Sequence, residues 1–304
     1  MASTLTPARL DTGFAAAFTA LCLGAAAMGI SPIFVRYAAA DVGPFASAFW
    51  RVGLALPVLY AWMRIDEARA PARPRRSFTR ATIVAGVVFA GDLFFWHLAI
   101  LKTTIANATF FATTAPLFVV LVTWLVLRQR IERATVMGLA LCLAGGVALI
   151  GESLDADPGR IVGDLYGIAT AFFFGLYFIA VGRARADAGA ARVTFEAGVI
   201  TSVILLAVAL VLDGRVLPQT WPGLAALVAM AIISHAGGQG LLAVALGRLP
   251  ATFSSLVIFL EALVAAICAW ILLGEALALP QILGGAMILV GIWIARPNPE
   301  PPIP

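Results

Sequence analysis

The chain has 304 residues, of which 62% are hydrophobic and only 12% are charged. Soluble domains are about 45–50% apolar and about one quarter charged, so no soluble core could hide this much apolar surface. The net charge of +4 could suggest a nucleic-acid partner, but arginine-rich loops on one side of a membrane explain it without one. Composition therefore excludes a soluble domain and predicts a chain embedded in lipid.

Ten apolar segments follow one another along the chain. Backbone groups in lipid must be satisfied within a segment or barrel, and segments of this length predict helices. The first segment is too long for a signal peptide, so we expect it to be retained. The fold class is predicted to be an all-α integral membrane protein. Its expected transmembrane helices cover residues 14–35, 45–63, 81–101, 104–127, 134–151, 161–182, 193–212, 222–246, 252–273 and 279–296.

Basic residues are distributed unevenly between the expected loops. With a cytoplasmic N-terminus, 15 of them fall inside and four outside, namely Arg36, Lys102, Arg160 and Arg215. By the positive-inside rule, both termini are then cytoplasmic, which agrees with an even number of helices. The chain has 19 arginines and one lysine, which favours a GC-rich bacterial genome and hence a bacterial inner membrane.

The chain repeats itself with a constant offset of 146 residues. This offset brings Ala38-x-Ala40-Asp41-x-Gly43 onto Ala184-x-Ala186-Asp187-x-Gly189 without a gap. Further matches along both halves pair Gly29 with Gly175, Gly91 with Gly237, Trp124 with Trp270, Gly138 with Gly284, and Gly145 with Gly291. One offset that holds through both halves indicates an internal duplication.

Each repeat holds five helices, an odd number, so the second repeat crosses the membrane in the opposite sense from the first. The predicted domains are a first five-helix repeat over residues 1–151 and an inverted second repeat over 152–304. Inverted repeats are typical of secondary transporters, which bind substrate near the midplane and expose it to each side in turn. The sequence leaves the oligomeric state open, because small residues pack both bundles and dimers.

Both halves carry a similar series of short motifs. The first half has Leu98-Ala99, Ala115-Pro116, Ile131-Glu132 and Gly145-Gly146, and the second has Ala245-Leu246, Glu261-Ala262, Gly274-Glu275 and Gly284-Gly285. In these motifs the chain resembles the drug/metabolite transporter superfamily, specifically its ten-helix EamA-type exporters, over nearly its whole length. The second half has Ala262 where that family has proline, which argues against a proline kink in helix nine. The resemblance is greatest to amino acid exporters, including the aromatic amino acid exporter, and implies efflux of amino acids or related metabolites.

Ionisable side chains within the apolar segments are few, and each costs roughly 2.5–3.5 kcal/mol to place in lipid. Asp92 and Trp96 lie four residues apart, so a helix presents them on one face, with His97 on a neighbouring stripe. His235 and Gln239 have the same spacing in helix eight, the repeat mate of helix three. We therefore expect helices three and eight to form facing walls of one substrate cavity.

Glu261, in helix nine, is a candidate for proton coupling, and Asp92 and Arg51 share that assignment. The alternative for all three is a structural ion pair between helices. Hydroxyl, amide and aromatic groups of neighbouring helices complete the predicted substrate site, although such groups are as often helix-packing contacts. These residues are Asn107, Tyr177, Ser254 and Phe259.

The sequence predicts no enzyme, no cofactor and no metal. Gly238-x-Gly240-x-x-Ala243 matches a dinucleotide fingerprint in letters, but it lies inside an apolar helix without a preceding strand. The predicted partners are a small-molecule substrate and the lipid bilayer. We expect an exporter of aromatic and other neutral amino acids; an exporter of cationic drugs or nucleosides and a passive facilitator remain alternatives.

Overall fold

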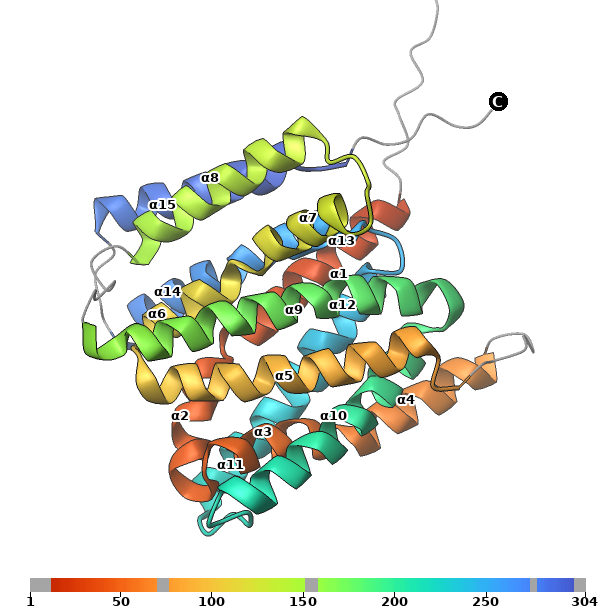
Figure 1. Ribbon diagram of the computed structural model, residues 1–304, viewed down its shortest axis with the longest axis vertical. Coiled ribbons are helices and arrows are strands. Elements are labelled where there is room, and N and C mark those ends of the chain that lie inside the picture. Colours follow the sequence, from red (N-terminus) through yellow and green to blue (C-terminus); the bar gives the residue numbers. More distant parts are fainter. Residues whose placement is uncertain (1–11, 70–76, 151–157, 274–277, 298–304) are drawn as a thin grey trace, which may run out of the picture.

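The structure is a computed structural model that describes residues 12–69, 77–150, 158–273 and 278–297. This part of the chain contains helices and no strands (Figure 1). Eight helical spans are long and apolar enough to cross a membrane, and two shorter apolar helices, Arg133–Leu149 and Leu279–Ile294, bring the segments to ten. The predicted fold class is confirmed. The predicted domain boundary at 151/152 lies outside the described residues.

We number the membrane segments one to ten in chain order. Segments one to five are α1 (Thr12–Gly29) with α2 (Ser31–Val42), α3 (Pro44–Gly53) with α4 (Leu56–Arg69), α5 (Arg80–Lys102), α6 (Ile105–Thr113) with α7 (Ala115–Leu125), and α8 (Arg133–Ile150). Segments six to ten are α9 (Ile161–Asp187), α10 (Ala190–Leu212), α11 (Trp221–Ala229) with a π-helical stretch (Met230–Gln239) and α12 (Gly240–Ala245), α13 (Ala251–Leu256) with a 3₁₀ turn (Val257–Phe259) and α14 (Leu260–Leu273), and α15 (Leu279–Ile294).

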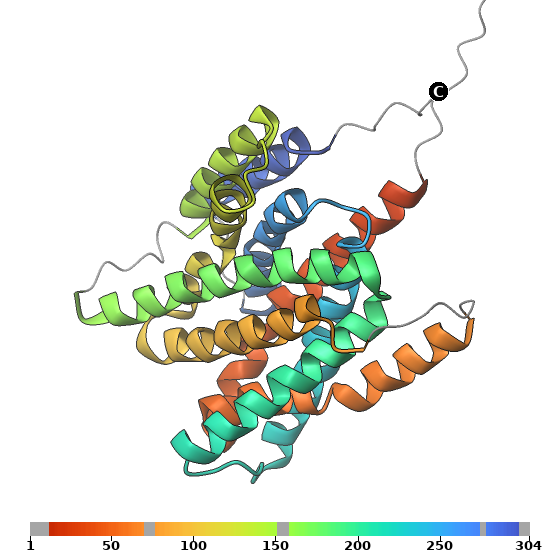
Figure 2. The same cartoon turned by 45° about the vertical axis from the view of Figure 1, so that its right-hand side comes forward.

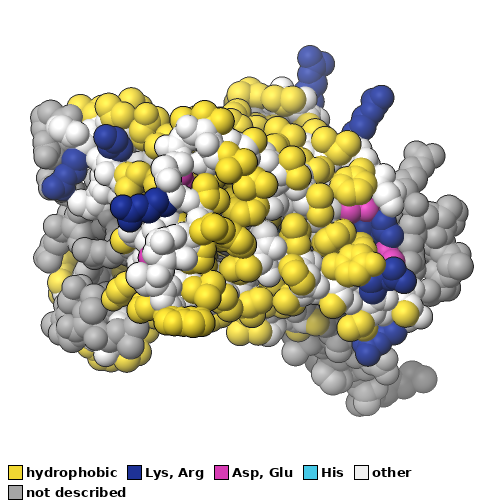
Figure 3. Space-filling view, turned by 90° about the horizontal axis from the view of Figure 1, so that it is seen from below, with side chains coloured by type: hydrophobic (Ala, Val, Ile, Leu, Met, Phe, Trp, Pro, Cys, Tyr) yellow, Lys and Arg dark blue, Asp and Glu magenta, His cyan; other side chains and the backbone are white. Residues whose placement is uncertain are grey.

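Large apolar side chains point outward from the bundle, as expected for a surface solvated by lipid. Trp124, Val211 and Trp293 are 58%, 81% and 71% exposed. Figure 3 shows apolar side chains covering the middle of one face, with basic side chains gathered at its two ends. We call one of these the arginine-rich end. It lies at the right of Figure 1 and holds the junctions of α4 with α5, α7 with α8, α9 with α10, and α12 with α13.

Several segments predicted as single helices are broken near their middle. Segment one breaks at Ile30, segment two at Leu54 and segment four at Thr114. A proline follows each break within three residues, and its ring removes a hydrogen-bond donor and clashes with the preceding turn. Segment nine breaks too, at its 3₁₀ turn, although it has Ala262 at the position equivalent to Pro116. This interruption involves no proline, so it does not conflict with the expectation that segment nine lacks a proline kink.

The two halves exchange equivalent contacts, as halves related by a pseudo-two-fold axis do. In the contact of α8 with α15, a Cβ atom on Gly138 would lie 2.5 Å from the carbonyl oxygen of Gly291, and one on Gly145 would lie 2.6 Å from that of Gly284. The offset of 146 makes Gly138 equivalent to Gly284 and Gly145 to Gly291. Each of these contacts is therefore the image of the other, as two inverted repeats require.

The same exchange of partners surrounds the centre of the molecule. Gly29 of α1 packs on the backbone of Glu261 in segment nine, and its repeat mate Gly175 packs on the backbone of Ala115 in segment four. Segment one thus packs with segments eight and nine of the second half, whereas segment six packs with segments three and four of the first half. Each half contributes one helix to the other. The centre of the molecule lies between the group of segments one, eight and nine and the group of segments three, four and six.

Candidate functional site

A cavity lies at the centre of the molecule, between the two groups of helices. Its lining includes residues from segments one, two, three, four, six, eight and nine. Those residues are Met28, Gly29, Ser31, Pro32, Arg51, Asp92, Leu93, Trp96, Thr109, Ala112, Thr170, Phe174, Gln239 and Glu261. The breaks of segments one and four lie beside it, and interrupted helices next to a cavity are where transporters place substrate sites.

Three ionisable side chains meet in this cavity: Arg51 of α3, Asp92 of α5 and Glu261 of α14. Both carboxylates lie near enough to the Arg51 guanidinium for electrostatic interaction. The Nε atom of Arg51 and the Oε1 atom of Glu261 are buried, with no hydrogen-bond partner in the structure. Buried polar atoms of native proteins are normally paired with protein, water or ligand. This cavity therefore offers one cationic and two acidic groups that a polar ligand or water can complete.

Aromatic surface lies beside these charges. The guanidinium carbon of Arg51 is 5.4 Å from the centre of the Trp96 ring, which is within the range of a cation–π contact. Phe174 of α9 lines the opposite part of the wall and belongs to a stack with Tyr177 and Phe89. The arrangement can hold an aromatic or aliphatic group against Trp96 and Phe174 while its polar part meets the charged side chains.

The cavity is narrow in this conformation. It leaves about 40 Å³ for the centres of water-sized molecules, room for about three waters. Pockets that hold small organic ligands are usually several hundred cubic ångströms in volume. A substrate larger than a few waters therefore needs the walls to separate.

Five of the predicted site residues line the cavity: Arg51, Asp92, Trp96, Gln239 and Glu261. The expectation that helices three and eight face each other also agrees with the structure. The ring of Phe89 in α5 lies 5.5 Å from the ring of His235 in the π-helical stretch.

The other predicted residues lie outside the cavity lining. His235 and Tyr177 are buried, and each stacks on the ring of Phe89. His97 packs edge-on against Trp96, and its Nδ1 lies 2.7 Å from the carbonyl oxygen of Leu93.

The remaining three predictions, on segments four and nine, also fall away from the cavity. Asn107 donates to Asp164 at the start of α9, a contact that joins segments four and six. Ser254 is fully buried in α13. Phe259 packs against Gly146.

Segment one was missing from the predicted site, and in segment six the prediction named Tyr177 rather than the residues that line the cavity. These segments contribute Met28, Ser31 and Pro32 from the first and Thr170 from the sixth. The sequence Gly29-Ile30-Ser31-Pro32, which interrupts an apolar run, was the signal available for segment one. Thr170 carries no such signal, because it lies in an uninterrupted helix and reaches the cavity only through the packing of α9 on α5.

The fold has the architecture of a secondary transporter, with two repeats packed around a central cavity. The chain belongs to the EamA-like transporter family, whose model matches it twice, over residues 15–151 and 161–296. It is thus a multi-pass membrane transporter, and its substrate is expected to be a small molecule.

Two transporters of Archaeoglobus fulgidus, both described only as uncharacterized, are among its relatives. One is 26% identical over 276 residues, covering 91% of this chain and 94% of the relative. The other is 26% identical over 267 residues, covering 86% and 91%. A solved crystal structure of a protein that is 20% identical superposes with a TM-score of 0.75 over 93% of this chain and 96% of its own length. That likeness shows the fold alone.

Proposed function

We propose that this transporter exports amino acids, aromatic and other neutral ones, or related metabolites by alternating access. The observation that carries the proposal is the meeting of Arg51, Asp92 and Trp96 in one central cavity. A zwitterion presents a carboxylate to a guanidinium, an ammonium group to a carboxylate, and a side chain to an aromatic wall. Each of these pairings is favourable at a dry site, where polar groups are worth more than in water.

The proposed orientation in the membrane rests on the distribution of charge, and the proposed direction of transport rests on the resemblance to exporters. The arginine-rich end holds most of the basic residues, so the positive-inside rule orients it toward the cytoplasm of a bacterium and both termini with it. In this orientation the substrate enters the cavity from the arginine-rich end and leaves at the other.

Glu261 is the candidate for coupling transport to protons, with Asp92 beside the same arginine. A carboxylic acid that alternates between a closed cavity and water can exchange a proton once in each cycle. A passive facilitator would need no such exchange. A pH gradient imposed on proteoliposomes separates the two, because it drives uphill accumulation only in a coupled transporter.

The substrate class is tested by competition in proteoliposomes that hold the purified protein. Uptake of labelled phenylalanine is measured against an excess of each of the twenty amino acids, of phenethylamine, which lacks the carboxylate, and of phenylpropionate, which lacks the ammonium group. We expect neutral amino acids to compete and both truncated compounds to fail. Competition by the amine alone would instead assign the cavity, with its two acids and one arginine, to cationic drugs, and nucleosides tested in parallel cover the remaining alternative.

A further inference from the structure

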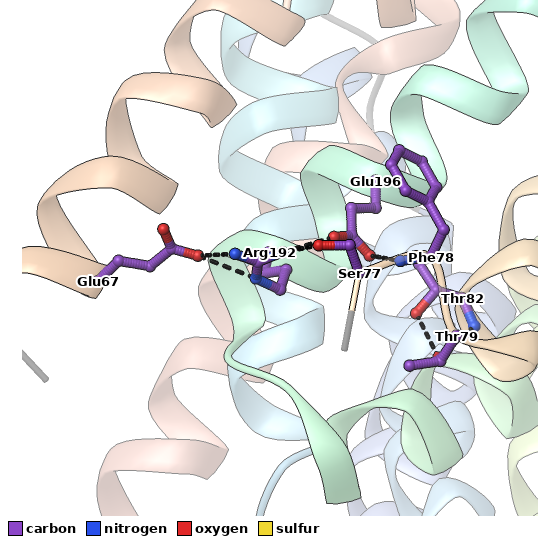
Figure 4. Close-up of polar contacts among 7 residues, drawn as sticks. All are labelled: Glu67, Ser77, Phe78, Thr79, Thr82, Arg192 and Glu196. Atoms are coloured by element: carbon purple, nitrogen blue, oxygen red, sulfur yellow. Dashed lines mark hydrogen bonds and ion pairs between the residues drawn. The ribbon is translucent and has the colours of Figure 1, made fainter. Parts of the chain in front are cut away.

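A network of ionic contacts joins segments two, three and seven at the arginine-rich end (Figure 4). Arg192, in the first turn of α10, donates from Nε to Glu67 of α4 at 2.9 Å and forms a second contact with the same carboxylate. It also donates to Glu196 and Ser77, each at 2.8 Å.

Glu196 extends this network to the start of segment three. Its second oxygen accepts the backbone N–H of Phe78 at 2.8 Å. The side chains of Arg192, Glu67 and Glu196 are 15%, 17% and 3% exposed, so the ion pairs are largely withdrawn from water. Charge-assisted hydrogen bonds of this kind are about twice as strong as neutral ones. The network therefore fastens α4 firmly to α10.

At the opposite end of the molecule, segments two and seven are joined by a different kind of contact. Asp213 follows α10 and accepts the backbone N–H of Ala46 in the first turn of α3. Gly43 precedes that turn with a φ of +89°, and a Cβ atom there would lie 2.8 Å from the Asp213 carboxyl carbon. Only glycine permits both this backbone conformation and this approach. The Asp213 side chain thus caps the N-terminus of α3 by accepting a backbone N–H of its first turn.

These two contacts are equivalent in the repeat. Adding 146 to Glu67 gives Asp213, and adding 146 to Ala46 gives Arg192. The pseudo-two-fold axis exchanges segment two with segment seven. If transport moves two groups of helices that this axis relates to each other, segment two belongs to one group and segment seven to the other. The contact of α10 with α3 and α4 therefore lies between the two groups. It is on the flank of the molecule opposite the α8–α15 pair (Figure 2).

From these observations we propose that Glu67–Arg192 and Asp213–Ala46 are a pair of opposed latches, one for each end of the transport path. Both are fastened in this structure, in agreement with its narrow cavity. Opening at the arginine-rich end breaks the first latch and keeps the second, and opening at the other end does the reverse. The proposal rests on alternating access, which belongs to the proposed function, but it does not depend on the identity of the substrate.

The test uses the full chain without its native cysteines, carrying Thr109→Cys as a reporter in the cavity. A membrane-impermeant maleimide is applied to intact cells and to inverted membrane vesicles, and Gly214→Cys, at an open turn beyond α10, identifies the side that faces the medium. Glu67→Gln is expected to raise labelling from the arginine-rich side about tenfold, and Asp213→Ala to raise it by a similar factor from the other side.

Two further variants serve as controls. Arg64→Gln removes an arginine from the same helix whose hydrogen bond, among the described residues, is to Tyr60 of its own helix, so it should leave labelling unchanged from both sides. Asp213→Asn retains an oxygen that can cap α3 and should restore most of the closure lost in Asp213→Ala.

The sidedness of labelling decides the proposal. If Glu67→Gln and Asp213→Ala change labelling equally from both sides, or only lower the melting temperature, the contacts are static and the proposal is wrong. Because labelling is measured without substrate, a transporter that fails to carry amino acids would still test the latches. A transporter that carries them with no change in sidedness would overturn the latches alone.

Discussion

The guanidinium carbon of Arg51 in segment two lies 5.4 Å from the centre of the Trp96 ring in segment three. This contact places the only arginine of the cavity directly on its aromatic wall. Such contacts are worth about 2 kcal/mol when desolvated, so they fix the guanidinium in place without neutralising it. Arg51 is thereby positioned to face Asp92, Glu261 and any ligand between them.

Trp96→Ala should reduce amino acid efflux by at least about tenfold, because it removes both the aromatic wall and the support of Arg51. Trp96→Phe retains a ring and should retain most of the activity. Efflux from cells is measured together with the amount of protein in the membrane. Equal efflux from the wild type and Trp96→Ala, at equal protein levels, would mean that this wall does not touch the substrate.

His235→Phe separates packing from function at a second position. Both ring nitrogens of His235 are buried without a partner, and the ring stacks on Phe89. Phenylalanine retains the stack and removes two unsatisfied polar atoms, which cost about 1–3 kcal/mol each when left unpaired. We expect a melting temperature in detergent at least equal to that of the wild type, together with impaired efflux. Unimpaired efflux would reduce His235 to a packing residue.

Gly145→Ala should destabilise the protein by about 1–3 kcal/mol, since the new methyl group would force α8 and α15 apart. Its Cβ would lie 2.6 Å from the backbone oxygen of Gly284, which cannot rotate away. Gly214→Ala is the matched control, because nothing lies within 4 Å of the atom that it adds. The melting temperatures of the two variants are compared by heating each protein and monitoring its loss by size-exclusion chromatography. A loss of stability in the control alone would contradict the packing described for this pair.

Asp213 makes opening at its own end sensitive to pH. Burial raises the pKa of this carboxyl above its ordinary value, against the opposing effect of the backbone hydrogen bonds from Ala46 and Phe45. Opening exposes the group to water and lowers the pKa again, so protons favour the closed form. This contribution is complete below the ordinary pKa and is lost as the pH rises through the raised one.

Labelling of the cavity reporter from the Asp213 side should therefore fall as that side is acidified from neutral pH toward about pH 4. Asp213→Asn retains a capping oxygen but cannot titrate, so it should remove the pH dependence. A profile that is the same in both proteins would assign the dependence to another group.

Much of the fold could be predicted from sequence, because the length of the apolar segments and the repeat can be read directly along the chain. Apolar length gave the ten segments, and the offset of 146 gave the equivalent positions of the two halves, such as Gly138 and Gly284. The helix breaks were harder to predict. Pro116 indicated one directly, but the break in segment nine has no proline to mark it.

The site was predicted unevenly for a related reason. Arg51, Asp92 and Glu261 stood out because a charge in an apolar segment demands an explanation wherever it lies. Asn107 and Ser254 had no comparable signal, since the same groups bond neighbouring helices, as Asn107 does with Asp164. Met28 and Thr170 are ordinary residues of apolar helices, and only the exchange of segments one and six between the halves brings them to the cavity.

The most direct test of the central claim is protection of the cavity by substrate. In a chain without its native cysteines, Thr109→Cys is alkylated in proteoliposomes with and without saturating phenylalanine, and Val147→Cys, on an exposed face of α8, serves as the control. We predict that phenylalanine slows alkylation at position 109 about tenfold and leaves position 147 unchanged. Unchanged alkylation at position 109, in protein that still transports phenylalanine, would place the substrate elsewhere and contradict the account.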